Sequence, residues 1–198
     1  MAAEKQTIGI LLFEDVEELD FVGPMEVFGA ASLMGASCAL QLVAESVAPV
    51  RCRWGMRVIP DLSIAKSGPL DLVVIPGGPG ARTHAFKNEE ILHYVKLPHR
   101  FVMSVCTGSV ILAASGLLTN QTATTHHAHL DKLREYSGVT VRDKARFVIG
   151  EGIATSGGVS AGIDLSLALV SRLWGMEIAR KTAEVLEWQS TSWQGDGK

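Results

Sequence analysis

The chain lacks a strong excess of charge, a block of basic residues and any long hydrophobic run. Its 198 residues include 18 Lys and Arg against 21 Asp and Glu, a net charge of −3. A chain this close to neutrality has no positive surface to neutralise nucleic-acid phosphates. The longest apolar runs, such as residues 72–76 and 101–106, are far shorter than the ~20 residues that span a bilayer. We therefore expect no nucleic-acid partner and no membrane insertion.

Cysteine is scarce, and the three that are present, Cys38, Cys52 and Cys106, form no spaced framework of pairs. One cysteine would remain after any single disulfide, so reduced thiols are the simpler interpretation. The N-terminus also lacks a basic region followed by an apolar stretch and a small-residue cleavage site. These features predict a cytoplasmic protein.

Hydrophobic residues nevertheless make up 47% of the chain, and short apolar runs alternate with helical patterns. Strands are predicted at residues 8–13, 39–44, 70–75, 101–105, 121–125 and 139–143, with hairpins at 50–59 and 146–156. Helices are predicted at residues 88–96, 107–115, 128–136, 161–173 and 176–189, and a further helix has Pro24 in its first turn. Asn88 is a plausible N-cap for the helix that follows it.

This alternation, without repeats or a linker, predicts one α/β domain over residues 1–189 and a frayed polar tail over 190–198. The expected architecture is a three-layer sandwich, a mainly parallel sheet flanked by helices. Ligands of such folds bind beyond the carboxyl ends of the strands. The loops after Phe13, Ile75 and Val105 are therefore the candidate site loops.

Cys106 is the strongest candidate for a reactive residue. A buried strand is predicted to run directly into it, and small residues, including Gly108, open a helix behind it. This is the layout of a nucleophile elbow. Backbone N–H groups and the dipole at a helix N-terminus lower a thiol pKa, so we expect a depressed pKa for Cys106 alone among the three cysteines. The alternative is a buried structural cysteine.

The segment Pro76-Gly77-Gly78-Pro79-Gly80 follows another predicted strand. Its glycines would let backbone N–H groups approach a ligand closely. No Gly-Lys-Ser/Thr follows, and no helix is expected directly after it, so it is not a phosphate-binding loop. A tight turn without a binding role explains the pattern equally well.

An acidic segment, residues 14–20, follows the first strand. Most of it is typical of a solvated face, but Asp20 stands between Leu19 and Phe21. A carboxyl group among apolar neighbours is expected to be partly buried, with a raised pKa. Alternatively, Asp20 only favours the start of the next helix through the helix dipole.

His126, His127 and His129 cluster in the second half of the chain. No cysteine or carboxylate stands at metal-ligand spacing from them, so no metal site is predicted. A single histidine facing Cys106 would be more useful, as a base or an orienting group. The remaining histidines, His84, His93 and His99, are expected at the surface.

Five segments, taken together and in this order, resemble the ThiJ/PfpI superfamily over nearly the whole chain. They are Leu19-Asp20-Phe21-Val22-Gly23-Pro24, Ile75-Pro76-Gly77-Gly78, Ser104-Val105-Cys106-Thr107-Gly108, Ala123-Thr124-Thr125-His126 and Gly157-Gly158-Val159-Ser160-Ala161-Gly162-Ile163-Asp164. The resemblance implies a flavodoxin-like fold, that of class I glutamine amidotransferases. The first and third segments are most similar to the isonitrile hydratase-like subgroup and to the sensor-like domain of some AraC-type regulators. The chain ends near the end of that domain, so the DNA-binding half of a regulator is not expected.

Departures from the superfamily pattern narrow the implied activity. A glutamine amidotransferase has a His two residues before a Glu. In this chain the residue two places after His126 is Ala128, and the residue two places after His127 is His129. PfpI-type peptidases have a His directly after the cysteine, where this chain has Thr107, which disfavours peptidase activity. Most of the superfamily brings a Glu to the cysteine, but the hydratase-like group brings an Asp, and Asp20 fits that position.

The resemblance therefore implies cofactor-independent hydration of a small-molecule isonitrile to an N-substituted formamide. Cys106 would attack, protonated Asp20 would supply the proton, and Thr107 would orient the reacting group or water. Gly77, Gly78 and His126 would bind substrate or developing charge. The alternatives are a non-catalytic or redox-responsive sensor and a glyoxalase- or deglycase-like enzyme acting on 2-oxoaldehydes. The superfamily also implies a homodimer.

Overall fold

A seven-stranded sheet forms the centre of the computed structural model, which describes residues 5–195. Its order is β10-β11-β7-β6-β1-β2-β5, and every neighbouring pair is parallel except β10 with β11. The strands are β1 (Gln6–Leu11), β2 (Cys38–Ala44), β5 (Leu62–Ser63), β6 (Leu72–Ile75), β7 (Val102–Ser104), β10 (Phe147–Ile149) and β11 (Ile153–Ser156). The predicted three-layer α/β sandwich with a mainly parallel sheet is confirmed.

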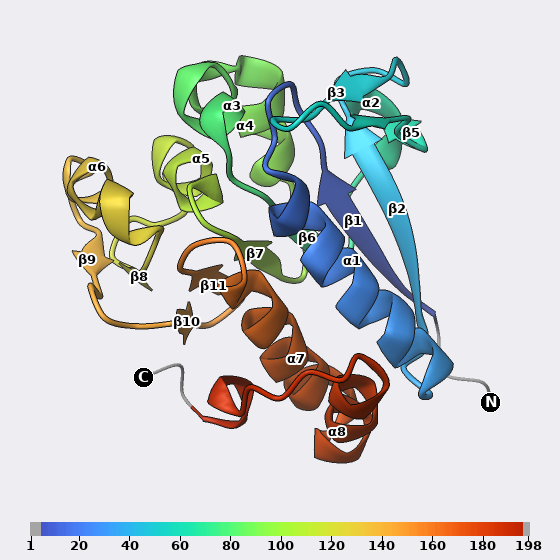
Figure 1. Ribbon diagram of the computed structural model, residues 1–198. Coiled ribbons are helices and arrows are strands. Elements are labelled where there is room, and N and C mark those ends of the chain that lie inside the picture. Colours follow the sequence, from blue (N-terminus) through green and yellow to red (C-terminus); the bar gives the residue numbers. More distant parts are fainter. Residues whose placement is uncertain (1–4, 196–198) are drawn as a thin grey trace.

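Helices cover both faces of this sheet (Figure 1). On one face α1 (Glu18–Leu33), α7 (Ala161–Trp174) and α8 (Met176–Val185) pack against one another. On the other lie α3 (Pro79–Thr83), α4 (Glu89–Val95) and α5 (Gly108–Ala114). The central strands β1 and β6 are buried on both sides, which is why their sequences are continuous apolar runs rather than alternating ones.

The remaining elements are short. They are the antiparallel pair β3 (Val50–Arg51) and β4 (Arg57–Val58), the parallel pair β8 (Thr122–Ala123) and β9 (Thr140–Val141), helices α2 (Ile64–Ser67) and α6 (Leu130–Arg134), and the 3₁₀ turns η1 (Ala85–Lys87), η2 (His127–His129) and η3 (Ser192–Gln194). Both predicted hairpins are present, and the Asn88 side chain caps α4. Within residues 5–195 no helix is both long and apolar enough to cross a membrane.

Three expectations about helix ends were wrong. Pro24 lies inside α1, which begins six residues earlier at Glu18 with Glu18 and Asp20 in its first turn. The acidic residues suit the positive end of the helix dipole, and they mark the helix start better than the proline does. Helix α3 begins at Pro79, directly after Gly78, because proline fits the first helical position. Helix α8 ends at Val185, not at residue 189.

The C-terminal segment is packed rather than frayed as far as it is described. Trp193 in η3 is only 3% exposed and belongs to the core, and η3 contacts α7. A buried indole removes a large apolar surface from water, which explains why this polar-looking segment docks. Residues 196–198 of the predicted tail lie outside the described residues.

Candidate active site

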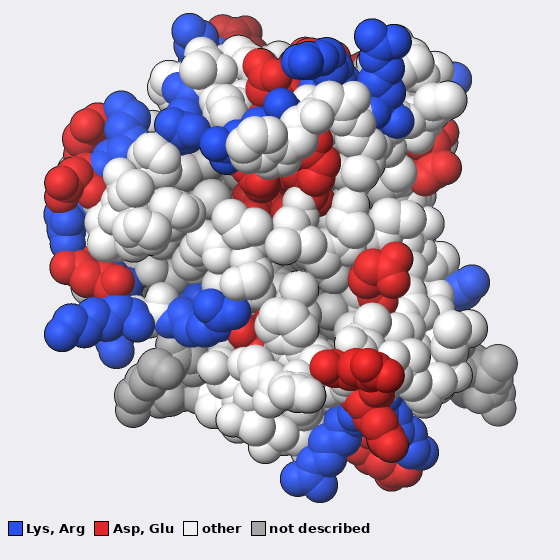
Figure 2. Space-filling view, in the orientation of Figure 1, with Lys and Arg blue, Asp and Glu red and all other residues white. Residues whose placement is uncertain are grey.

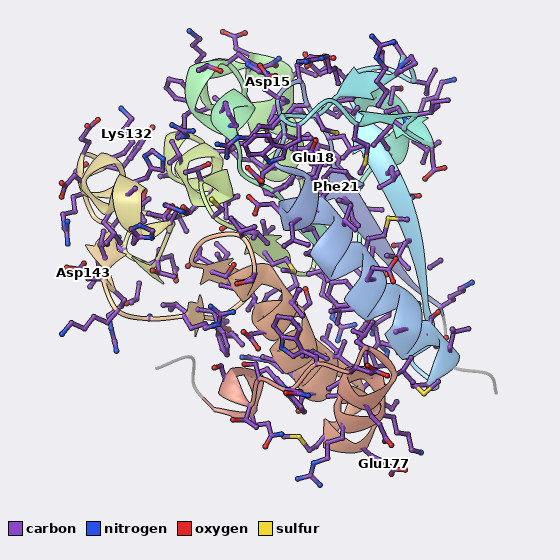
Figure 3. The ribbon with its side chains drawn as sticks, viewed as in Figure 1. Asp15, Glu18, Phe21, Lys132, Asp143 and Glu177 are labelled. Atoms are coloured by element: carbon purple, nitrogen blue, oxygen red, sulfur yellow. The ribbon has the colours of Figure 1, made fainter. Side chains whose placement is uncertain are left out.

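The loops that follow β1, β6 and β7 meet at one cavity, at the carboxyl ends of three adjacent strands, as predicted. The cavity has a volume of about 190 Å³, equal to the liquid volume of about six water molecules. Figure 3 labels Asp15, Glu18 and Phe21 at this end of α1. The lining residues are Glu17, Arg53, Gly78, Arg82, Cys106, Thr107, His126, His129 and Val159.

Cys106 stands on a strained turn between β7 and α5. Its φ is +55°, a left-handed conformation that non-glycine residues rarely adopt. Its N–H donates to the Gly157 carbonyl at 3.0 Å, and its carbonyl accepts from the Thr125 hydroxyl at 2.9 Å. A Cβ at Gly108 would lie 2.1 Å from the Ile75 carbonyl oxygen, so only glycine fits behind the cysteine. These contacts hold the cysteine in the elbow that the sequence predicts.

Asp20 lies beside this thiol at the start of α1 and is completely buried. Its Oδ2 accepts a hydrogen bond from the Gly77 N–H at 2.9 Å. Its Oδ1 is buried and has no nitrogen or oxygen partner among the described residues. The Cys106 thiol is close enough that each of the two groups shifts the pKa of the other. Asp20 therefore combines both interpretations of its sequence position, because it occupies the first helical turn and is also buried.

Burial raises the pKa values of both members of this pair. It raises the pKa of Asp20 to about 7, against a hydrogen bond from Gly77 that lowers it. Burial and the neighbouring Asp20 charge raise the pKa of the Cys106 thiol to about 12, although N–H groups of Thr107 and Val159 lower it. The expected depressed pKa of Cys106 was therefore wrong, because desolvation outweighs the helix N-terminus. At pH 7 Asp20 is about half-protonated while Cys106 keeps its proton, and because the two groups interact they titrate as a pair.

Gly77, Gly78 and Thr107 form the wall between these two groups. The Gly78 N–H donates to the Thr107 Oγ1 at 3.0 Å, and the Gly77 N–H is occupied by Asp20. Both N–H groups that we expected to bind substrate thus have protein partners. A Cβ at Gly77 would lie 2.5 Å from the Thr107 nitrogen, so this residue must be glycine for the wall to close. The hydrogen bonds make the glycine loop a support for Asp20 and Thr107.

His126 and His129 both line the cavity, whereas His127 is exposed. The His126 Nδ1 accepts from the Ala128 N–H at 3.1 Å, so a neutral ring carries its proton on Nε2. Burial, together with nearby cations, lowers the pKa values of both cavity histidines. The sequence cluster thus places two neutral donors near Cys106.

Two other histidines are less exposed than we predicted. His84 is half-buried against Phe13. His99 is half-buried as well, and its Nδ1 accepts from the Leu70 N–H at 3.1 Å. Of the three histidines expected at the surface, His93 is exposed.

Three charged cavity residues were not singled out from the sequence: Glu17, Arg53 and Arg82. Glu17 is 7% exposed, and its carboxylate pairs with the Arg53 guanidinium at 2.5 Å. Its other oxygen accepts from the Trp54 indole N–H at 3.0 Å. Arg53 comes from the predicted hairpin, whose position over the loop after β1 no local pattern reveals. One sequence feature could have indicated that Arg82 lies at the site: it stands four residues after Gly78, in a candidate site loop.

No group of three or more His, Cys, Asp or Glu side chains within residues 5–195 is arranged to hold a metal ion. All three cysteines are free and buried. The site thus combines the Cys106 thiol, the Asp20 carboxyl group beside it and the charged and polar side chains that line the cavity.

Comparisons with known proteins agree with this architecture. The sequence matches the DJ-1/PfpI family over residues 6–172. Isonitrile hydratase of Pseudomonas putida is 36% identical over 185 residues, which cover 91% of this chain and 78% of that protein. Glutathione-independent glyoxalase DJR-1.2 of Caenorhabditis elegans is 29% identical over 183 residues, 89% of this chain and 93% of that protein.

A solved structure is also similar over most of its length. The crystal structure of a ThiJ/PfpI family protein from Pseudomonas syringae has a TM-score of 0.86 at 28% identity, covering 94% of this chain and 76% of that one. Both the sequence matches and the structural match extend across the sheet and the elbow. The chain therefore belongs to the DJ-1/PfpI family.

Proposed function

We propose that the protein hydrates isonitriles to N-substituted formamides through Cys106. The observation that carries the proposal is the completely buried carboxyl group of Asp20 beside the Cys106 thiol, which lines the cavity. A buried carboxyl group whose pKa lies near 7 is matched to proton transfer at neutral pH. The 36% identity to an isonitrile hydratase supports the same reaction.

The first step joins the cysteine to the substrate. The Cys106 sulfur attacks the terminal isonitrile carbon while its proton passes to Asp20. Protonated Asp20 then delivers this proton to the same carbon, which gives an N-substituted thioimidate. N–H groups of Thr107 and Val159, which interact with the sulfur, stabilise the charge that develops there.

The second step releases the product. Asp20, now a carboxylate, takes a proton from water, whose oxygen adds to the thioimidate carbon. Asp20 passes this proton to the nitrogen, the carbon–sulfur bond breaks, and the proton of the added hydroxyl returns to the Cys106 sulfur. One water is consumed for each isonitrile, and no cofactor enters the balance. Asp20 therefore acts in turn as base, acid, base and acid, and ends the cycle as it began.

A second candidate is glyoxalase-like action on a 2-oxoaldehyde, which the 29% identical glyoxalase supports. The same cysteine would attack the aldehyde carbon. A redox-responsive sensor is less well supported, because oxidation favours an exposed, low-pKa thiolate. Cys106 is 7% exposed and its pKa is raised.

A substrate panel tests the proposal. Methyl isocyanoacetate, cyclohexyl isocyanide and methylglyoxal are offered to the wild type and to the Cys106→Ser variant. We expect formamide from the isonitriles with the wild type only. Turnover of methylglyoxal alone would contradict hydration and favour the glyoxalase. Absence of any turnover, with peroxide-sensitive Cys106, would favour the sensor.

Two expectations about the protein's context stay predictions. Sedimentation of the purified chain tests the homodimer, and fractionation of the source cells tests the cytoplasmic location.

A further inference from the structure

Arg82 is the charged side chain of the cavity that lacks a counter-ion. The cavity also contains Arg53 and Glu17, but these two pair with each other. No ion pair or hydrogen bond involves the Arg82 side chain among the described residues, and its Nε is buried without a partner. A guanidinium group that is partly removed from water and unpaired is unfavourable unless a ligand supplies the acceptor.

The surroundings of Arg82 are those of an anion site. His126 and His129 lie near enough for the Arg82 charge to lower their pKa values. The two rings are 5.7 Å apart between centroids, and the neutral His126 ring offers an Nε2–H donor. Glu17 makes its hydrogen bonds with Arg53 and Trp54 and has none with Arg82 among the described residues. In Figure 2 basic and acidic side chains gather at the upper part of the face, where these loops lie.

We propose that the substrate carries a carboxylate, which Arg82 binds with help from His126, while its isocyano carbon reaches Cys106. This rests on the proposed hydration and specifies its substrate class as small α-isocyano carboxylates, with N-formyl amino acids as products. Arg82 and Cys106 line the same cavity of about 190 Å³. A cavity of this size accommodates a small molecule such as isocyanoacetate. A planar guanidinium group binds a carboxylate through two parallel hydrogen bonds, which would also orient the reacting end.

Kinetics of a matched pair of substrates test this class. Isocyanoacetate and methyl isocyanoacetate differ in the negative charge, so their ratio of kcat/KM reports recognition of the carboxylate. We expect the wild type to favour the acid by tenfold or more. Arg82→Gln should lower this acid-over-ester ratio by about 10–100-fold, since hydrogen bonds between charged groups are the strong ones. Arg82→Lys should retain part of the preference, and Arg180→Gln, an exposed arginine on α8, should leave the ratio unchanged.

Calorimetric binding of the product separates this proposal from the reaction. N-formylglycine should bind the wild type and Arg180→Gln more tightly than its methyl ester does, and Arg82→Gln should abolish the difference. If acid and ester are hydrated and bound alike, or if Arg82→Gln weakens both equally, the carboxylate site is refuted while hydration stands. If N-formylglycine binds through Arg82 but no isonitrile is converted, the anion site stands and the proposed reaction fails.

Discussion

Two completely buried aspartates, Asp20 and Asp164, have opposite surroundings. Asp164 in α7 has a partner on each oxygen: Arg146 Nε at 2.5 Å and the Trp188 indole N–H at 2.9 Å. Asp20 in α1 has one backbone N–H on Oδ2 and no nitrogen or oxygen partner on Oδ1 among residues 5–195. Asp164 thus joins three segments of the fold, whereas Asp20 lies beside a thiol.

The comparison shows how pairing decides what a buried acid can do. A buried carboxylate that is paired and hydrogen-bonded is held in its charged form. Asp20 lacks a cation in direct contact, so burial raises its pKa to about 7 and makes it able to exchange a proton. Arg53, whose charge acts in the opposite direction, is already paired with Glu17.

The largest expected difference between the two aspartates is in activity. Asp20→Asn keeps the shape but cannot carry a proton from sulfur to carbon, so isonitrile hydration should fall ~10²–10⁴-fold. Asp164→Asn should stay within about tenfold of the wild type, because Asp164 does not contact the reacting atoms. Initial rates at saturating substrate, at a temperature below the unfolding range of both variants, measure this difference. Full activity in Asp20→Asn would remove Asp20 from the mechanism.

The order reverses for stability. Asp164→Asn removes the charge that compensates Arg146, whose side chain is one-third exposed. We expect a loss of about 2–3 kcal/mol, below the full penalty for a wholly buried pair because water reaches Arg146. Urea unfolding at neutral pH measures it. An unchanged midpoint would mean that the Arg146 contact contributes no net stability.

Asp20→Asn should instead stabilise the protein at pH 8. The folded-state pKa of Asp20 lies above the unfolded value of 3.8, so the wild type loses stability as the pH rises from about 4 to about 7. The neutral amide avoids this penalty, and we expect a gain on the order of 1–3 kcal/mol at pH 8. The gain should shrink at pH 5, as thermal unfolding at the two pH values can show. A loss near 1 kcal/mol at pH 8 would mean that Asp20 only favours the start of α1.

Much of the fold could be predicted because its signals are local. The apolar runs of β1, β6 and β7 have no polar alternation, which is typical of parallel strands buried on both faces. Their carboxyl ends then located the site, and the small residues after Cys106 indicated the elbow. The start of α1 was missed because a proline rule outweighed the acidic first turn at Glu18 and Asp20.

The electrostatics of the site could not be predicted from local sequence. The raised pKa of Cys106 depends on how far the elbow is buried and on the charge of Asp20. Asp20 and Cys106 are 86 positions apart in the sequence. Arg53 and Trp54 reach Glu17 from a hairpin that is distant in sequence. These pKa shifts and hydrogen bonds arise from packing between distant elements, so the sequence of no single segment predicts them.

Alkylation of Cys106 as a function of pH tests the shared proton most directly. Iodoacetamide labelling of each cysteine is followed by mass spectrometry in the wild type, Asp20→Asn and Asp164→Asn. Because the reactive form is the singly protonated pair, the Cys106 rate in the wild type should rise with an apparent pKa of about 7. Asp164→Asn should keep this inflection, and Asp20→Asn should lose it. A wild-type inflection at the ordinary thiol pKa of ~8.5, unchanged in Asp20→Asn, would contradict the account, as would faster labelling of Cys38 or Cys52 at neutral pH.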